Sequence, residues 1–240
     1  SDYSNYIKTT MTSLYHYTNL KSFELILKHK TIRFSSLAYV NDKCEGETQD
    51  IGNLGRYIFV SCWTSNKIEN PRLWEIYGDH LHGVRIGLEY PIFELFYDIE
   101  NSPSLVPHIP EEINDYTLMP TEINKLVTKI LYTDKSQDIR PKTLFEFWNQ
   151  GIFDFGKVGK RKSNLWSKEE ESRFLIYSLP VKWNNNPEIN GIHLIGDDIQ
   201  LMKKDKLIPI TFIDIKIQNE IYQNMQIVKG CNMTISEEKE

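Results

Sequence analysis

Several short stretches of the chain alternate apolar with polar residues or consist mainly of β-forming residues, as strands with a buried face do. The clearest alternation is TIRFSS at 31–36, where Ile32 and Phe34 alternate with polar residues. Runs rich in β-branched and aromatic residues predict further strands at 14–18, 56–63, 83–90, 172–178, 191–195 and 208–217. Residues 124–132 fit either a helix or a strand, and we favour the strand.

Fewer stretches have the spacing of an amphipathic helix. Asn19 can cap the first, whose apolar face consists of Leu20, Phe23, Ile26 and Leu27. A second helix is expected to begin at Pro71 and to end near Gly78, and a third to begin at Pro141 and to run through 144–148. Strands outnumber helices and no regular βαβ alternation occurs, which predicts an α+β fold with a largely antiparallel sheet system.

The chain length of 240 residues predicts a single domain over 1–240. Four prolines between 98 and 120 indicate an irregular insertion there, and the tail SEEKE (236–240) is expected to be disordered. A composition of 40% hydrophobic and 25% charged residues is that of a soluble globular domain that needs no disulfide or metal to fold.

Charge and cysteine content narrow the classes of function. The net charge of −5 argues against wholesale nucleic-acid binding but not against a local basic patch. Cys44, Cys62 and Cys231 are too far apart for a zinc signature, and their odd number does not suggest a disulfide framework. Without a signal peptide, or an apolar run of the roughly 20 residues that span a bilayer, we expect a cytoplasmic protein with no metal and no membrane contact.

The segment SNLWSKEEESRFLIY (163–177) places three glutamates directly before an apolar run. If it is all strand, Glu169, Glu171 and Arg173 share one face, while Glu170 and Phe174 lie on the other. Such a charged face is either a solvated edge or the floor of a polar cleft that handles a developing positive charge. From this segment alone, the solvated face is favoured.

Other candidate residues also have ordinary structural interpretations. A lone histidine such as His16 usually donates one ring proton to a backbone carbonyl. Trp74 and Tyr77 share a helix face and can simply pack in the core. The basic run at Lys157, Lys160, Arg161 and Lys162 is expected to be a solvated loop, or else a phosphate contact. None of the glycine-rich nucleotide loops, zinc-protease motifs or serine-hydrolase motifs occurs.

In combination, six short motifs carry a family resemblance. They are Tyr15-His16-Tyr17-Thr18, Arg33 to Ser36, Asn41-Asp42 with Glu45, Ser61-Cys62-Trp63, Leu73-Trp74 with Tyr77 before Gly83-Val84, and Trp166 with Glu169, Glu171 and Arg173. In this order they resemble a large bacterial family catalogued only as a domain of unknown function. That family is similar to a branch of the ADP-ribosyltransferase superfamily, and the match covers about 14–90 and 160–178.

The resemblance implies a fold in which two small antiparallel sheets split around an NAD cleft, with NAD as substrate. It implies catalytic roles for His16 on the first strand and Glu171 at the start of a late strand, with Glu169 acting on the acceptor. The remaining residues implied to contact NAD are Tyr17, Thr18, Arg33, Ser35, Trp74, Tyr77 and Arg173. We expect His16 and Glu171 to line one pocket of roughly drug-sized volume, with Tyr77 or Tyr17 nearby.

The function implied is therefore that of an ADP-ribosyltransferase, a glycosyltransferase on NAD, that modifies a protein or nucleic acid in bacterial conflict or phage defence. An NAD glycohydrolase, which uses water as the acceptor, is the alternative within the enzymes. From another class, a catalytically silent module that binds a nucleotide or nucleic acid is the third possibility.

Overall fold

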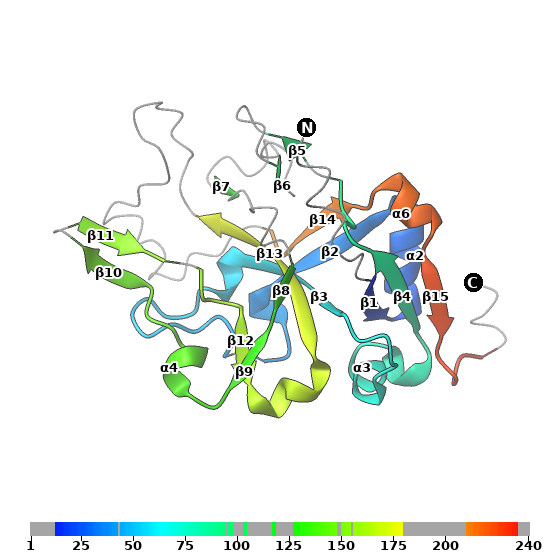
Figure 1. The fold of residues 1–240 in the computed structure, drawn as a ribbon, viewed down its shortest axis with the longest axis horizontal. Helices are drawn as coiled ribbons and strands as arrows, with labels where there is room; N and C mark the ends of the chain where they lie inside the picture. Colours follow the sequence, from blue (N-terminus) through cyan, green and yellow to red (C-terminus); the bar gives the residue numbers. More distant parts are fainter. Residues whose placement is uncertain are drawn as a thin grey trace.

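The computed structural model describes residues 13–42, 44–94, 96–97, 103–104, 117–118, 127–147, 150–154, 156–179 and 210–234. Within these residues the fold is mixed α+β, with mostly antiparallel strands and few helices, as the sequence predicts. The strands form a nine-stranded sheet and three two-stranded ones, and the short helices pack around them (Figure 1).

The strands are β1 (Ser13–Thr18), β2 (Thr31–Ser36), β3 (Ile58–Thr64), β4 (Val84–Glu89), β5 (Phe96–Tyr97), β6 (Pro103–Ser104), β7 (Thr117–Leu118), β8 (Val127–Lys129), β9 (Leu131–Thr133), β10 (Leu144–Phe147), β11 (Gln150–Phe153), β12 (Arg161–Ser163), β13 (Glu171–Leu179), β14 (Phe212–Lys216) and β15 (Gln226–Lys229). The α-helices are α2 (Leu20–His29), α3 (Pro71–Ile76), α4 (Ser136–Ile139) and α6 (Asn219–Gln223). Short 3₁₀ helices are η1 (Leu37–Tyr39), η2 (Gly55–Tyr57), η3 (Asp79–Leu81) and η6 (Asn164–Glu169).

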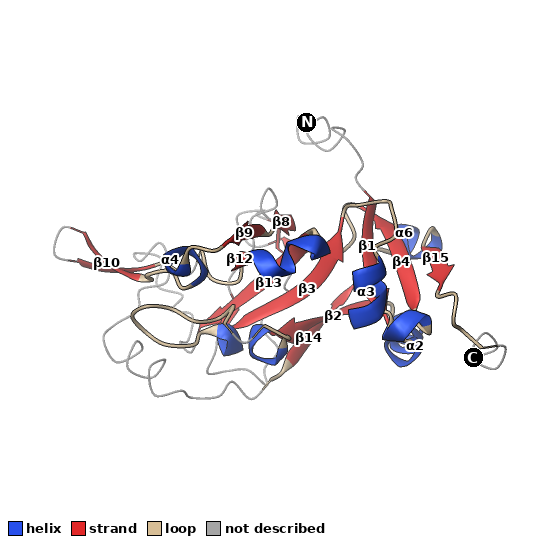
Figure 2. Ribbon diagram, turned by 90° about the horizontal axis from the view of Figure 1, so that it is seen from below, coloured by secondary structure: helices blue, strands red, loops and turns tan. Residues whose placement is uncertain are grey.

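Strand β3 is the centre of the large sheet. On one side it pairs with β13 along its whole length, from Thr64 opposite Glu171 to Ile58 opposite Tyr177. On its other side, in the described residues, β2 pairs with it only near Val60 and β1 only at Thr64. The sheet therefore divides into one arm of β2 and β14 and another of β1, β4 and β15, and the second arm runs at a steep angle to β3 and β13 (Figure 2).

The main core lies under the centre of this sheet. Phe174 on β13 is 1% exposed, and its ring meets those of Phe93, Trp63 and Phe34 at centroid distances of 4.8, 6.1 and 6.3 Å. Edge-to-face contacts of this kind add to the hydrophobic gain of burying each ring. The Phe174 side of β13 therefore faces the core.

The helix signals in the first part of the chain are also confirmed. The Asn19 side chain accepts a hydrogen bond from Ser22 N–H and caps α2, and Asn70 caps α3 with Pro71 in its first turn. The predicted apolar face of α2 is only partly buried, because Leu27 is 41% exposed. Of the helices that the structure describes, none is both long and apolar enough to span a membrane.

The prediction of a helix from Pro141 is wrong, because residues 144–147 form the strand β10. This strand pairs with β11 in a hairpin at one end of the molecule (Figure 1). The carboxylate of Asp50 accepts bonds from the backbone N–H groups of Thr143 and Leu144 at 2.8 and 2.6 Å, which fixes these residues in an extended conformation. The favoured strand at 124–132 appears as β8 and β9. After β14 the structure also contains α6 and β15, for which the sequence pattern predicts no element.

Three predictions fall wholly or mainly outside the described residues. These are the irregular insertion at 98–120, of which only β6 and β7 are described, the strand at 191–195 and the disordered tail at 236–240.

Truncating Phe174 tests the aromatic core. Phe174→Ala should lower the free energy of unfolding by roughly 3–5 kcal/mol, because it leaves a cavity among three rings. Phe212→Ala is the control, since Phe212 is 42% exposed on the edge strand β14. Urea unfolding measures both, and equal losses for the two variants would contradict this placement of the core.

Candidate functional site

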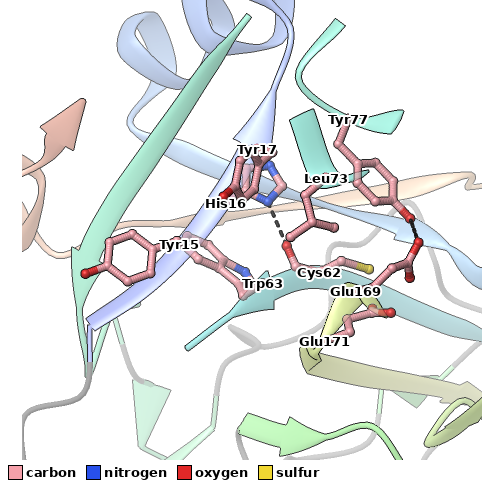
Figure 3. Close-up of a pocket in the computed structure, with 9 residues that line it drawn as sticks. All are labelled: Tyr15, His16, Tyr17, Cys62, Trp63, Leu73, Tyr77, Glu169 and Glu171. Atoms are coloured by element: carbon pink, nitrogen blue, oxygen red, sulfur yellow. Dashed lines mark hydrogen bonds between the residues drawn. The ribbon is translucent and has the colours of Figure 1, made fainter. Parts of the chain in front are cut away.

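A pocket opens where β1, β3, α3 and η6 approach one another. It is lined by Tyr15, His16, Tyr17, Cys62, Trp63, Leu73, Tyr77, Glu169 and Glu171. His16 lies on one side of it, Tyr77 and the two glutamates on the other, and Cys62 between them (Figure 3). Its volume of about 40 Å³ is room for two or three water molecules, so the drug-sized volume expected from the sequence is not found.

His16 is fixed by a bond to the strand beside it. Its Nδ1 lies 2.8 Å from the carbonyl oxygen of Cys62. A carbonyl can only accept, so Nδ1 carries the proton, and burial lowers the pKa of the ring and keeps it neutral at pH 7. The other nitrogen, Nε2, is then a hydrogen-bond acceptor.

Tyr77 follows the last residue of α3 and brings a phenol to the pocket. Its hydroxyl lies 3.5 Å from Oε1 of Glu169, which is longer than an ordinary O–H···O bond. Burial raises the pKa of Tyr77, and the charge of Glu169 acts in the same direction, so the phenol stays protonated. Oε1 of Glu169 therefore retains capacity to bond to a ligand.

Below the pocket lies a buried ion cluster of five residues: Glu45, Lys162, Glu169, Glu171 and Arg173. The Lys162 ammonium group is 2.8 Å from Glu169, 2.8 Å from Glu171 and 3.3 Å from Glu45. The Arg173 guanidinium bonds to Glu45 and Glu171 and, at 3.1 Å, to the carbonyl of Gly159. Gly159 has a φ of +77°, which favours glycine at the turn that leads into β12.

The pKa values of the cluster show which charges dominate. Burial alone would raise the pKa of Glu171, but the charges of Arg173 and Lys162 outweigh it and lower the pKa to about 2. For Glu45, burial is the larger effect and raises the pKa despite the same two cations. Burial and then the charge of Glu171 raise the pKa of Cys62, so its side chain is a thiol and not a thiolate.

The segment 163–177 differs from a continuous strand. Glu169 ends the 3₁₀ helix η6, Glu170 has left-handed dihedrals (φ 47°, ψ 46°), and β13 starts at Glu171. This kink still directs Glu169 and Glu171 to the same lysine, whereas Glu170 is exposed and bonds to Asn66 at 2.6 Å. The prediction of a solvated face, which this segment alone favoured, is wrong, because Glu169 and Glu171 are 1% and 4% exposed.

The other residues implied to contact NAD lie in several places. Thr18 is buried at the end of β1, and Trp74 is buried with its indole N–H bonded to Glu69. Arg33 and Ser35 lie on β2 outside this pocket, and Arg33 forms an exposed ion pair with Asp214. Arg173 supports the pocket from below through Glu171.

Sequence reasoning missed three residues that bond to or form ion pairs with the buried cluster and its glutamates. Glu45 belongs to the motif Asn41-Asp42 with Glu45, but nothing in the sequence indicates that it is a buried counter-ion of Lys162 and Arg173. Lys162 was expected in a solvated basic loop, yet it lies on β12 with its side chain 4% exposed. Tyr132 on β9 accepts a bond from Glu171 N–H at 2.9 Å, and no local signal pointed to this contact.

Comparisons of the chain with protein-family models, with curated proteins and with solved structures gave no match. Within the described residues, no group of three or more histidine, cysteine, aspartate or glutamate side chains is arranged to hold a metal ion.

Removing Arg173 tests the cluster and its pH dependence. Arg173→Met should lower the free energy of unfolding at pH 7 by roughly 3–5 kcal/mol, because it leaves buried carboxylates short of a cation. In this variant the folded-state pKa of Glu45, which burial already raises, should rise further, and that of Glu171 should rise from about 2 to above the unfolded value near 4.5, so protonation relieves the loss as the pH falls. The deficit should thus be smaller at pH 5 than at pH 7.

Arg33→Met is the matched control, since it breaks an ion pair whose side chains are 46% and 35% exposed. It should cost less than about 1 kcal/mol. Denaturant unfolding at both pH values measures the differences, and an Arg173→Met deficit that is the same at pH 5 and pH 7 would refute the electrostatic explanation.

Proposed function

We propose that this protein is an ADP-ribosyltransferase that uses NAD as substrate and modifies a macromolecular acceptor, a protein or a nucleic acid. The observation that carries the proposal is the convergence of His16, Tyr77, Glu169 and Glu171, from distant parts of the chain, on one pocket. The family resemblance implies a histidine, an aromatic residue and a glutamate at the NAD site, and the pocket contains each of these residue types. The α+β fold and the division of the sheet on one side of β3 are compatible with this class.

The hydrogen-bonding character of the pocket supports a ligand rich in hydroxyl groups. His16 Nε2 is an acceptor, and the carboxylates of Glu169 and Glu171 can only accept. A ribose presents two neighbouring hydroxyl donors. The ion cluster carries three carboxylates against two cations, and its net negative charge complements the positive charge of nicotinamide in NAD.

In the proposed reaction the bond between C1′ of the ribose and the nicotinamide nitrogen breaks, and nicotinamide leaves with the electron pair. The ribose passes through an oxocarbenium-like state, as in glycoside cleavage. Glu171 stabilises this cation, which accelerates the reaction because the charge develops fully only in the transition state. The acceptor's oxygen or nitrogen then bonds to C1′, and Glu169 takes up the proton that it loses.

Entry of NAD requires the pocket to widen, because 40 Å³ is much less than a nicotinamide ring and its ribose occupy. Two exposed hydrogen bonds join the segment before α3 to the segment before β13. Asn66 bonds to Glu170 at 2.6 Å, and Asn70 bonds to the carbonyl of Lys168 at 2.6 Å. Exposed bonds of this kind contribute about 1 kcal/mol each, so parting the two segments costs little.

A second candidate is a module that binds NAD without turning it over. It is favoured by the bonding of Glu171, whose two oxygens are already engaged by Arg173 and Lys162. The two candidates differ in catalysis and not in binding, so they need separate measurements.

The binding measurement uses His16. NAD titrated into the protein should bind saturably, and His16→Ala should weaken binding about fivefold, because one hydrogen bond contributes about 1 kcal/mol. His80→Ala is the control, since His80 is exposed and pairs with Glu75. Isothermal titration calorimetry gives the affinities, and no binding by the intact protein at millimolar NAD would exclude both candidates.

The catalytic measurement compares the three glutamates with labelled NAD and cell extract. Glu171→Gln should reduce turnover by roughly 100-fold or more with little change in NAD affinity, as expected for a group that acts in the transition state. Glu169→Gln should impair transfer to the acceptor more than hydrolysis of NAD. Glu170→Gln is the internal control, because Glu170 is exposed and points away from the cluster.

The products separate the possibilities. Label attached to a macromolecule supports the transferase, free ADP-ribose alone indicates a glycohydrolase, and binding without any product indicates the silent module. A Glu170→Gln loss as large as that of Glu171→Gln, in folded protein, would refute the assignment of these side chains.

A further inference from the structure

The ammonium group of Lys162 touches every carboxylate of the ion cluster. It lies 2.8 Å from Oε2 of Glu169, 2.8 Å from Oε2 of Glu171 and 3.3 Å from Oε1 of Glu45. Two of its three N–H donors bond to Glu169 and Glu171, and Oε1 of Glu45 forms an ion pair with it without a hydrogen bond. Because the side chain is only 4% exposed, water screens these interactions poorly.

Glu169 and Glu171 need such a group in order to share the pocket. Their Oε2 atoms bond to the same nitrogen and so lie no further apart than twice 2.8 Å. Two carboxylates this close repel each other, and one takes up a proton unless a cation lies between them. Arg173 does not fill this place for Glu169, since its contacts in the described part of the chain go to Glu45, Glu171 and Gly159.

We propose that Lys162 is a positioning residue of this pocket: its ammonium group draws Glu169 and Glu171 together and balances their charge, so that both face the same ligand. The identity of that ligand rests on the proposed function, but the arrangement of the two carboxylates does not.

The groups around Lys162 come from every element packed against it. They are Glu45 from the loop before β3, Cys62 from β3, Tyr77 after α3, Tyr132 from β9, Glu169 from η6, and Glu171 and Arg173 from β13. Burial raises the pKa of Tyr132 to about 12, and Tyr77 and Cys62 are also neutral at pH 7. Glu45 is thus the third carboxylate whose charge Lys162 balances, and it does not line the pocket.

The test removes the lysine charge and then restores the charge balance. In Lys162→Met, Glu171 should titrate roughly 1 to 3 pH units higher than in the wild type, because a cation in direct contact has been lost. Adding Glu45→Gln removes one carboxylate and should reverse at least half of this change. Carbon NMR of the glutamate carboxyl groups follows the titration without any need for activity.

Lys168→Met is the matched control, since Lys168 is an exposed lysine of η6 and its loss should leave the Glu171 titration unchanged. If NAD turnover is measurable, the pH at which it falls on the acid side should be higher in Lys162→Met than in the wild type. In the double variant it should return towards the wild-type value. An unchanged Glu171 titration in Lys162→Met, or a double variant no closer to the wild type than the single one, would overturn the proposal.

If Lys162→Met alone does not fold, the double variant is compared with Glu45→Gln. The proposal then expects Glu171 to titrate higher in the double variant, and equal titrations would overturn it. The Glu171 titration can also shift as expected while the protein neither binds nor cleaves NAD. That result would support the positioning role of Lys162 and refute the proposed function.

Discussion

The ion pairs among Glu45, Lys162, Glu169, Glu171 and Arg173 are the constraint on which the rest of the site depends. Moving a charged group out of water costs several kcal/mol, and the cost is offset only when each ion meets partners in good geometry. The five residues come from a loop, from β12, from η6 and from β13. An arrangement that left one of these buried ions without its partner would cost about 3–5 kcal/mol, so the cluster favours the arrangement in which the charges pair.

Strand β13 connects this cluster to the hydrophobic core. Its residues alternate, so Phe174 and Ile176 pack in the main core while Glu171 and Arg173 face the cluster. Because β3 pairs with β13 along its length, Cys62 and His16, which is bonded to the Cys62 carbonyl, are held at a fixed distance from the glutamates. The backbone that carries the wall of the pocket is thus positioned by the packing that stabilises the fold.

Features that depend on neighbouring residues could be predicted from the sequence, and features that depend on distant ones could not. The alternation at Ile32 and Phe34, the cap at Asn19 and the helix start at Pro71 are local signals, and the structure contains the elements that they predict. The strand β10 depends on Asp50, which is 93 residues away from Thr143, so the periodicity after Pro141 was misleading. Lys162 follows other basic residues, as in a solvated loop. Its burial is explained by its ion pairs with Glu45, Glu169 and Glu171, none of which is adjacent to it in the sequence.

The two pocket glutamates are bonded differently, and this difference bears on what each can do. Both oxygens of Glu171 are bonded by Arg173 and Lys162, so the position of its charge is fixed. A charge that does not have to reorganise when a positive charge develops nearby stabilises that charge most effectively. Glu169 has one oxygen on Lys162 and the other 3.5 Å from the Tyr77 hydroxyl. A general base needs a free lone pair within reach of the proton that it removes, and Glu169 has one. Under the proposed function, this bonding therefore suits Glu171 to act as a fixed charge and Glu169 to take up a proton, which is the division of roles that the family resemblance implies.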